Sequence, residues 1–239
     1  MHVNSLTEIG LVRKANEDKF LADKKRGLFI VADGMGGHEA GELASSLAIK
    51  TLDEFLTLET ITNNDGQVLK DAVEIANRVI YNEAKSKSMC KGMGTTITAA
   101  IFKDYKLYIA HIGDSRAYLI RDGNIRLLTK DHSLVGELIR QGELTPQEAE
   151  NHPHRNILTR ALGTEPVVEI DLLEMVIQPG DILLLCTDGL SNFVNDQEIL
   201  TEVVNNGNNL KNTVNNLVQL ALKRGGLDNI TVVLVSYDG

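Results

Sequence analysis

The chain has 239 residues, of which 43% are hydrophobic, 24% charged and 4% aromatic, and it contains no tryptophan. This is an ordinary globular composition, and the length suits one large domain or two small ones. The formal net charge of −9 argues against a nucleic-acid or anionic-membrane binder, because both classes need a basic face. It is compatible with a protein that gathers carboxylates around cations.

The cysteines and the start of the chain predict a cytoplasmic protein. Cys90 and Cys186 lie far apart, and Cys186 ends the apolar run DILLLC, so we expect no disulfide framework and an inert, protonated thiol at Cys186. The first residues, MHVNSLTEIG, lack the basic and apolar pattern of a signal peptide. No apolar run approaches the ~20 residues that span a bilayer. We therefore expect one domain over residues 1–239 that is monomeric, inserts into no membrane and binds no nucleic acid.

The elements predicted for the first half follow from hydrophobic periodicity. Residues 27–32 read as a buried strand, and amphipathic spacing predicts two long helices, over 41–58 and 65–87. The β-rich stretch that follows has predicted strands at 93–102, 106–113, 116–123 and 124–129. An Asp-Gly-Asn turn between the last two apolar runs is typical of a β-hairpin.

The periodic signal weakens between residues 132 and 166. We expect a short helix at 133–144, a helix start with Thr145 as cap and Pro146 in the first position, and an irregular, mobile flap over 152–166. The predicted elements of the remaining chain are strands at 167–177, 181–187 and 229–237 and helices at 195–205 and 209–225. Long helices flanking strands that are joined by tight hairpins favour an α+β fold, with packed antiparallel sheets covered by helices.

Four aspartates lie next to apolar segments. Asp33 follows the strand in IVADGMGG, Asp188 follows the strand in LLLCTDGLSN, Asp114 lies just past the strand in YIAHIGDSR, and Asp228 precedes the strand in GGLDNITVVLVSY. A single Asp-Gly is usually a turn former, because its side chain accepts hydrogen bonds from the backbone ahead. If the four strand ends share one edge, however, their carboxylates crowd a half-buried pocket that only a cation makes tolerable. The all-oxygen donor set indicates Mg²⁺ or Mn²⁺ rather than zinc.

Two further features accompany these aspartates. Gly34, which has no side chain, would let its backbone carbonyl approach a metal closely. The segment TEIGLVRKANEDKF carries Arg13 followed by Glu17 and Asp18. A solvated charge cluster explains this spacing by itself, but an arginine fork beside a carboxylate–metal pocket is also the expected way to hold a phosphate with two hydrogen bonds.

Seven motifs together resemble one enzyme family. The segments GLVRKANED, VADGMGGH, GTTITAA, AHIGDSRAY, LTKDHS, CTDGLSN and DNITVVLV occur in this order over nearly the whole chain. They resemble the metal-dependent Ser/Thr protein phosphatases of the PP2C (PPM) family in their compact bacterial form. The resemblance implies a central antiparallel β-sandwich flanked by α-helices on both faces, in α-β-β-α layers, with a flap subdomain at about residues 132–164.

The resemblance also implies a metal centre. Asp33 would bridge two ions of Mn²⁺ or Mg²⁺, and the carbonyl of Gly34 would bind one of them. Asp188 and Asp228 would complete the coordination of the other ion. Asp114, together with Asp188, is similar to the third-metal site of bacterial members.

The remaining roles implied by the family concern water, substrate and proton transfer. Glu17 and Asp18 would hold waters of the metals, and Arg13 would grip the substrate phosphate. His38 is similar to the histidine proposed to protonate the leaving alkoxide, although stabilising a turn before the following helix explains it equally well. His111, in the middle of a predicted strand, is expected to be a packed and hydrogen-bonded residue.

The resemblance predicts a protein serine/threonine phosphatase that hydrolyses phosphoserine and phosphothreonine by metal-activated water. Its partners would be phosphorylated proteins, including a cognate bacterial Ser/Thr kinase whose action it opposes. Two alternatives stay open on the same fold. One is a non-catalytic phosphoprotein-binding regulator, and the other is a hydrolase of small phosphate esters.

Overall fold

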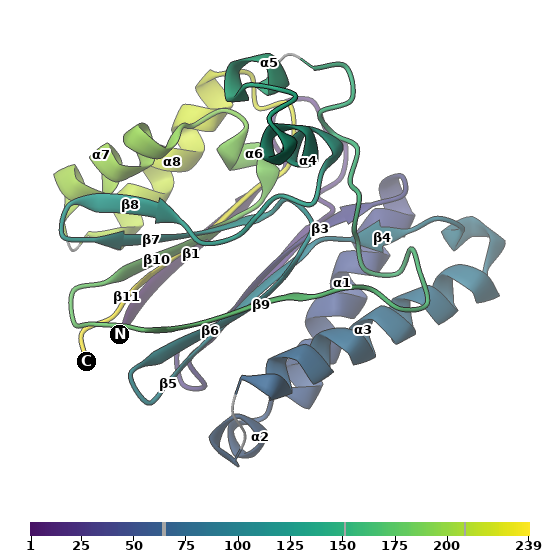
Figure 1. Cartoon of the computed structure of the whole chain (residues 1–239), viewed down its shortest axis with the longest axis horizontal. Helices are drawn as coiled ribbons and strands as arrows, with labels where there is room; N and C mark the ends of the chain where they lie inside the picture. Colours follow the sequence, from purple (N-terminus) through teal and green to yellow (C-terminus); the bar gives the residue numbers. More distant parts are fainter. Residues whose placement is uncertain (64–65, 151, 208) are drawn as a thin grey trace.

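The computed structural model describes residues 1–63, 66–150, 152–207 and 209–239, apart from the side chains of His38 and Glu150. In these residues two antiparallel β-sheets lie face to face, and helices cover both outer faces (Figure 1). The predicted α+β fold with α-β-β-α layers is confirmed.

One sheet has the strand order β1-β11-β10-β7-β8. Its strands are β1 (His2–Glu8), β11 (Ile230–Ser236), β10 (Ile182–Cys186), β7 (Arg116–Arg121) and β8 (Asn124–Leu127). Three helices pack their apolar side chains on the outer face of this sheet. They are α6 (Asp188–Ser191), α7 (Asp196–Asn206) and α8 (Leu210–Lys223).

The other sheet has the order β2-β3-β5-β6-β9, with a short strand β4 also paired to β3. Its strands are β2 (Asp18–Asp23), β3 (Leu28–Met35), β4 (Gly94–Thr95), β5 (Ile97–Lys103), β6 (Lys106–Ile112) and β9 (Asp171–Val176). Two long helices cover its outer face. These are α1 (His38–Phe55) and α3 (Gln67–Ser86), accompanied by α2 (Leu58–Asn63) and a 3₁₀ turn, η1 (Ser88–Cys90).

The apolar core has three layers. One lies between the two sheets, and one lies between each sheet and the helices that cover it. In β3, Leu28 and Ile30 pack under the helices, whereas Phe29 and Val31 face the other sheet. Strand β11 alternates in the same way, with Val233 among the residues that fill the inter-sheet layer. Because successive side chains of a strand point to opposite faces, Phe29 and Val31 share the inter-sheet layer while Leu28 and Ile30 lie on the other face of β3.

Two strands at the beginning of the chain were not predicted. Residues in β1 and β2 are mostly half-buried and include charged and hydroxyl side chains, so they carry no apolar alternation strong enough to signal a strand. Pairing with β11 and β3 makes them strands, which is a tertiary effect on a weak local preference.

Most other predicted elements are confirmed within a few residues, but several differences remain. Strand β3 continues to Met35 rather than ending at 32, so Asp33 lies inside a strand. The strand predicted from 167 begins only at Asp171, where it pairs with His111 of β6. Helices α2 and α6 and the turn η1 were not predicted, and the strand predicted at 93–102 is divided into β4 and β5. The predicted helix start at residue 65, and residue 151 of the predicted flap, lie outside the described residues.

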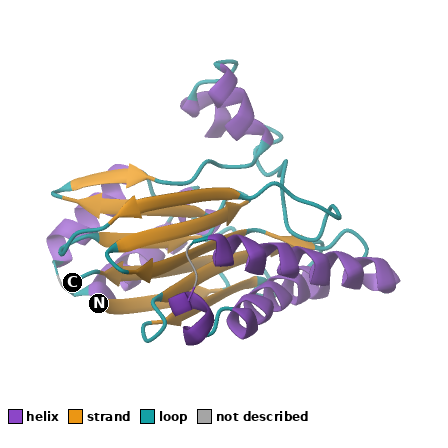
Figure 2. Cartoon of the chain, turned by 60° about the horizontal axis from the view of Figure 1, so that its bottom comes forward, coloured by secondary structure: helices purple, strands orange, loops and turns teal. Residues whose placement is uncertain are grey.

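Helices α4 (Leu134–Gln141) and α5 (Pro146–Glu150) stand apart from both sheets (Figure 2). Ser133 caps α4 by accepting a hydrogen bond from the Gly136 amide at 3.2 Å. Thr145 caps α5 as predicted: its hydroxyl accepts from the Glu148 amide at 3.3 Å and donates to the Glu148 carboxylate. The boundaries of the flap subdomain and its mobility stay predictions.

No helix of the described ranges is both long and apolar enough to cross a membrane. Both cysteines are buried free thiols. Burial raises the pKa of the Cys186 thiol to about 12, which agrees with the expectation of an inert, protonated side chain.

Asn77 ties helix α3 to the segment that leaves the flap, and its removal provides a test of the fold. Its side chain accepts from the Gly163 amide at 2.8 Å and donates to the Glu165 carbonyl at 3.0 Å, and the residue is buried. We expect Asn77→Ala to lower the free energy of unfolding in urea by about 1–3 kcal/mol, because it leaves buried backbone groups unpaired. The exposed neighbour variant Arg78→Ala should change it by about 0.5 kcal/mol or less. Equal effects of the two substitutions would contradict this role.

Candidate metal centre and active site

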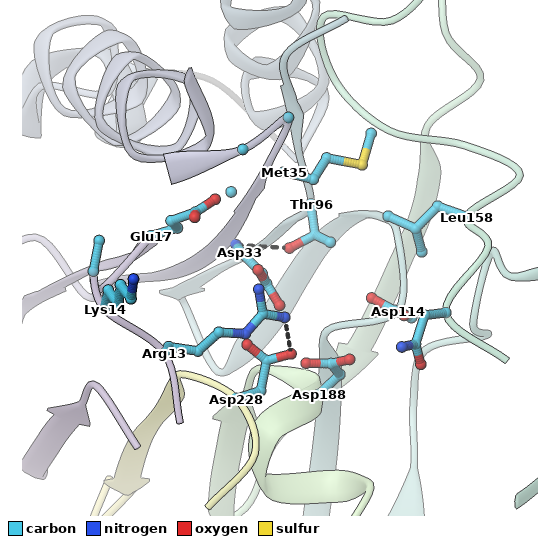
Figure 3. Close-up of a pocket in the computed structure, with 15 residues that line it drawn as sticks. Arg13, Lys14, Glu17, Asp33, Met35, Thr96, Asp114, Leu158, Asp188 and Asp228 are labelled. Carbon is cyan, nitrogen blue, oxygen red and sulfur yellow. Dashed lines mark hydrogen bonds and ion pairs between the residues drawn. The ribbon is translucent and has the colours of Figure 1, made fainter. Parts of the chain in front are cut away.

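The four predicted aspartates meet at one end of the sandwich. Asp33, Asp114, Asp188 and Asp228 line a single pocket of about 260 Å³, together with Arg13. Figure 3 shows the acidic side chains pointing into this space from both sheets. The expectation that distant carboxylates converge at one rim is therefore confirmed.

Asp33 is placed by strand alternation and held by hydroxyl groups. It follows Phe29 and Val31 on the inter-sheet side of β3, where the layer changes from apolar to polar. Its amide donates to the Thr96 hydroxyl at 2.9 Å, and that hydroxyl lies 2.7 Å from the buried hydroxyl of Ser115. The hydroxyl groups of Thr96 and Ser115 thus hold the backbone that carries the Asp33 carboxylate.

Asp18 lies beneath the pocket instead of on its lining. The β2–β3 register places it directly opposite Asp33, and it is only 2% exposed. Its Oδ2 accepts hydrogen bonds from the hydroxyls of Thr187 at 2.8 Å and Thr231 at 2.7 Å. In the described part of the chain, its buried Oδ1 has no hydrogen-bond partner.

Asp188 and Asp114 occupy the two segments that leave β10 and β6. Asp188 is the first residue of α6, and its Oδ2 accepts from the Asn192 side chain at 3.0 Å. Its Oδ1 is buried, and within the described ranges no group donates to it. Asp114 follows Gly113, whose amide donates to His132 Nδ1 at 3.1 Å. The base of the flap is thereby joined to the segment that carries Asp114.

Arg13 pairs with Asp228 at the open side of the pocket. Arg13 Nη2 donates to Asp228 Oδ2 at 2.6 Å, and the arginine side chain is 50% exposed. This hydrogen bond raises the pKa of Arg13, so the guanidinium is charged at any relevant pH. Figure 3 shows the guanidinium between Asp33 and Asp228, where its remaining N–H groups can meet an anion.

Gly34 and Gly41 have a packing role that the sequence did not reveal, and Glu17 lies against one of them. A Cβ on Gly34 would lie 2.0 Å from the carbonyl oxygen of Gly41 in α1. A Cβ on Gly41 would lie 1.9 Å from Glu17 Oε2. Close contact between β3 and α1 therefore requires both glycines, and Glu17, which also lines the pocket, is held against the helix.

Burial makes the carboxylates of this site costly to ionise. Desolvation raises the pKa of Asp18 to about 7 and that of Asp188 to about 6, with neighbouring carboxylates adding to both shifts. Desolvation likewise raises the pKa of Asp33 and Asp114 well above the ordinary value. Each group thus favours a partner that can replace the lost solvation, either a proton or a cation.

The donor set fits oxygen-preferring divalent cations. It consists of carboxylates, two of which keep a buried acceptor oxygen without a donor in the described residues. Over the same ranges, no three or more His, Cys, Asp or Glu side chains close around one point as a compact cage. Mg²⁺ and Mn²⁺ prefer oxygen ligands such as these carboxylates, and they usually keep several waters when bound.

The histidines and the supporting hydroxyl groups complete the site. His111 is 1% exposed and bonds Thr98 at 2.9 Å and the Lys130 carbonyl at 3.0 Å, which confirms the expectation of a packed, hydrogen-bonded residue. The His38 side chain lies outside the described residues. Sequence reasoning missed the polar residues that support the acidic groups, and only Thr231 lies within a strand, where alternation could have identified it; they are Thr96, Ser115, Thr187, Thr231 and Asn229.

Comparison with known proteins identifies the class to which this fold and site belong. The family model of Protein phosphatase 2C matches residues 2–230, and the chain belongs to that family. The serine/threonine phosphatase stp of Listeria monocytogenes is 41% identical over 248 residues, covering 100% of this chain and 96% of that protein. Protein phosphatase PhpP of Streptococcus pneumoniae is 39% identical over 243 residues, covering 100% of this chain and 98% of that protein.

Solved structures of phosphatases agree with this assignment. The Mycobacterium tuberculosis serine/threonine phosphatase PstP/Ppp superposes with a TM-score of 0.89 at 38% identity, covering 100% of this chain and 99% of that one. The catalytic domain of PstP in complex with two manganese ions gives a TM-score of 0.88 at 37% identity, covering 100% and 98%. The chain is a serine/threonine phosphatase, as predicted, and the family and this neighbour support a requirement for a divalent metal.

The raised carboxyl pKa values predict a pH-dependent response to Mg²⁺. A carboxyl group whose folded pKa lies above its unfolded value of about 3.9 stabilises the fold below that value, and this contribution is lost as the pH rises through the folded pKa. For Asp18 and Asp188 the loss falls between about pH 4 and pH 7. Because Mg²⁺ replaces the protons, the gain in unfolding free energy on exchanging EDTA for Mg²⁺ should grow from pH 5 to pH 8.

The gain is the difference between the unfolding free energies measured with urea in Mg²⁺ and in EDTA at the same pH. Protonation of groups remote from the cations, such as His111, affects both measurements equally and cancels. We expect it to rise by about 1 kcal/mol or more over this range. A gain that stays constant or falls with pH would show that the carboxylates do not exchange protons for cations.

Proposed function

We propose that the phosphatase hydrolyses phosphoserine and phosphothreonine with two ions of Mn²⁺ or Mg²⁺ in the core site and a third at Asp114 and Asp188. The observation that carries this proposal is the convergence of carboxylates from both sheets on one pocket beside Arg13. In it, Asp33, Gly34, Asp188 and Asp228 would hold the two core ions, with Asp33 as the residue proposed to serve both. Glu17 and Asp18 would hold waters of the ions.

The chain's own groups then perform the remaining tasks. When bound, divalent cations lower the pKa of a water and offset charge on the phosphoryl group. Arg13 would bind phosphoryl oxygens with the N–H groups that Asp228 does not occupy, and its contact with Asp228 orients the guanidinium over the pocket. The hydroxyls of Thr187 and Thr231 hold Asp18 without adding charge. The phosphoserine or phosphothreonine alkoxide needs a proton, and His38 as its donor stays a prediction.

The substrates proposed are phosphorylated proteins, among them a cognate Ser/Thr kinase whose action this enzyme opposes. The expected monomeric state, cytoplasmic location and flap at about residues 132–164 within one domain over 1–239 also stay predictions. Asn156 and Leu158 of the segment that leaves the flap helices line the pocket, and they support a role of that segment around the substrate.

Substitution of the metal carboxylates tests the mechanism. With saturating Mn²⁺, we expect Asp33→Asn and Asp228→Asn to lower kcat/KM for p-nitrophenyl phosphate at least about 100-fold, because each removes charge that holds a cation. EDTA should abolish hydrolysis by the wild type. The exposed control Asp71→Asn should match the wild type. Full activity of either site variant would refute the assignment.

Arg13 offers a separate test of phosphate binding. We expect Arg13→Ala to lower kcat/KM for a phosphothreonine peptide about 10- to 100-fold, while the Mn²⁺ concentration for half-maximal activity changes little. Arg126→Ala removes an exposed arginine on β8 and should have no such effect. If Arg13→Ala instead mainly weakened the response to Mn²⁺, Arg13 would act on the metal centre through Asp228 rather than on phosphate.

The alternative functions give different results in the same assays. A non-catalytic regulator would bind a phosphopeptide and release no phosphate at saturating Mn²⁺. A hydrolase of small esters would show a higher kcat/KM for p-nitrophenyl phosphate or a nucleoside monophosphate than for a phosphothreonine peptide.

A further inference from the structure

Three large exposed apolar side chains lie in the two segments that carry Arg13 and Asp228. Leu11 is 69% exposed, Val12 61% and Leu227 48%. Val12 directly precedes Arg13, and Leu227 directly precedes Asp228, so both segments lead into the arginine–aspartate pair of the site. We call Leu11, Val12 and Leu227 the apolar rim.

The two segments of the apolar rim lie side by side. The Leu11 amide donates to the Gly226 carbonyl at 2.7 Å. A Cβ on Gly226 would lie 3.0 Å from Leu11 Cγ, so the leucine side chain rests against this glycine. The apolar rim is therefore one surface made from two parts of the chain that are more than 200 residues apart.

The apolar rim is also built on a fixed backbone. The Asn229 side chain is buried and donates to the carbonyls of Ile9 at 2.9 Å and Ala15 at 3.0 Å, on both sides of the loop. Its Oδ1 accepts from the Glu17 amide at 2.8 Å. Gly10, with φ of +82°, passes so close to the Asp228 carbonyl that a Cβ would lie 2.3 Å from that oxygen. Such preorganisation lowers the entropy cost of binding a partner there.

The position of the apolar rim specifies its occupant. Figure 3 shows Arg13 and Lys14 on one side of the pocket and Leu158 of the flap segment on the other. A polypeptide whose phosphoserine or phosphothreonine reaches Arg13 has to pass over the surface around the pocket, and the apolar rim, next to Arg13 and Asp228 in the chain, is part of that surface. We propose that the apolar rim binds an apolar side chain of the substrate within a few residues of the phosphorylated residue. This inference rests on the proposed function, because it assigns a specificity to the same site.

The small size of the apolar rim favours a peptide segment over a second copy of the chain. A stable interface between proteins involves about 20–30 residues on each side. Three side chains can cover one or two substrate side chains, which is enough to select among phosphorylated sites. Solvent-exposed leucine and valine at this place also gain more from an apolar partner than from a charged one.

The test uses phosphothreonine peptides in a Ser/Gly background, with a single leucine placed in turn at each position from three residues before to three residues after the phosphothreonine. We expect wild-type kcat/KM to be about fivefold to tenfold higher for the best leucine peptide than for the leucine-free peptide, as when roughly half of a leucine side chain is buried. The double variant Leu11→Ser, Leu227→Ser should reduce this ratio to near one. The ratio is taken within each variant, so a general change in activity cancels.

Two further variants sharpen the result. Val204→Ser removes an exposed valine from helix α7 and should keep the wild-type ratio. Leu11→Lys should reverse the preference, favouring peptides with aspartate at the position where leucine was best, because the rim then offers a cation. This gain of a new preference cannot come from misfolding.

Several outcomes would overturn the proposal. Wild type without a leucine preference, or a double variant that retains it, would exclude the apolar rim as a peptide site. Concentration-dependent self-association that the double variant abolishes would make it a contact between copies instead. If the wild type hydrolysed p-nitrophenyl phosphate but none of the peptides, the proposed function would fail, and that result differs from peptide hydrolysis without preference.

Discussion

The structure depends on holding several carboxylates in a partly desolvated space between two β-sheets. Over most of its length the inter-sheet layer is apolar, but at one end the same strand faces carry Asp18, Asp33 and hydroxyl residues. Like charges in such a place destabilise the fold unless protons, hydrogen-bond donors or cations offset them. Assembling the sandwich therefore also assembles the proposed metal site, so that in the proposed function the binding of divalent ions and the folding stability are physically linked.

Neutral donors, which are hydroxyl groups, the Asn192 side chain and the Asn229 amide, provide most of the direct support for these carboxylates. Thr187 and Thr231 both donate to the same oxygen of Asp18, and Thr96 accepts from the amide of Asp33. A hydroxyl donor orients a carboxylate without neutralising it, so the charge remains available for a cation. Arg13 is the exception, and its place at the open side, half exposed, suits a group that binds an incoming anion rather than a structural partner.

Chemistry and recognition occupy different parts of the molecule. Most of the acidic residues lie on strands or next to strand ends, whereas Arg13, Lys14, Asn156 and Leu158 reach the pocket from loops. On one side, Asn229 holds the loop that carries Arg13 through several backbone groups. On the other, helices α4 and α5 stand away from the sheets (Figure 2), and the segment that follows them lines the pocket with Asn156 and Leu158. A fixed catalytic end with variable surroundings lets one fold serve different substrates.

The sequence by itself determined the family, the order of most elements and the identities of the aspartates, because strand-then-Asp patterns and helical periodicity are local signals. Only the tertiary structure decided that β1 and β2 are strands, that Asp33 lies within β3, and that Asp18 is buried under the pocket. These outcomes depend on pairing across the sheet and on which strand faces oppose each other. Such contacts join residues more than 200 positions apart, as between Asp18 and Thr231, and no local pattern encodes them.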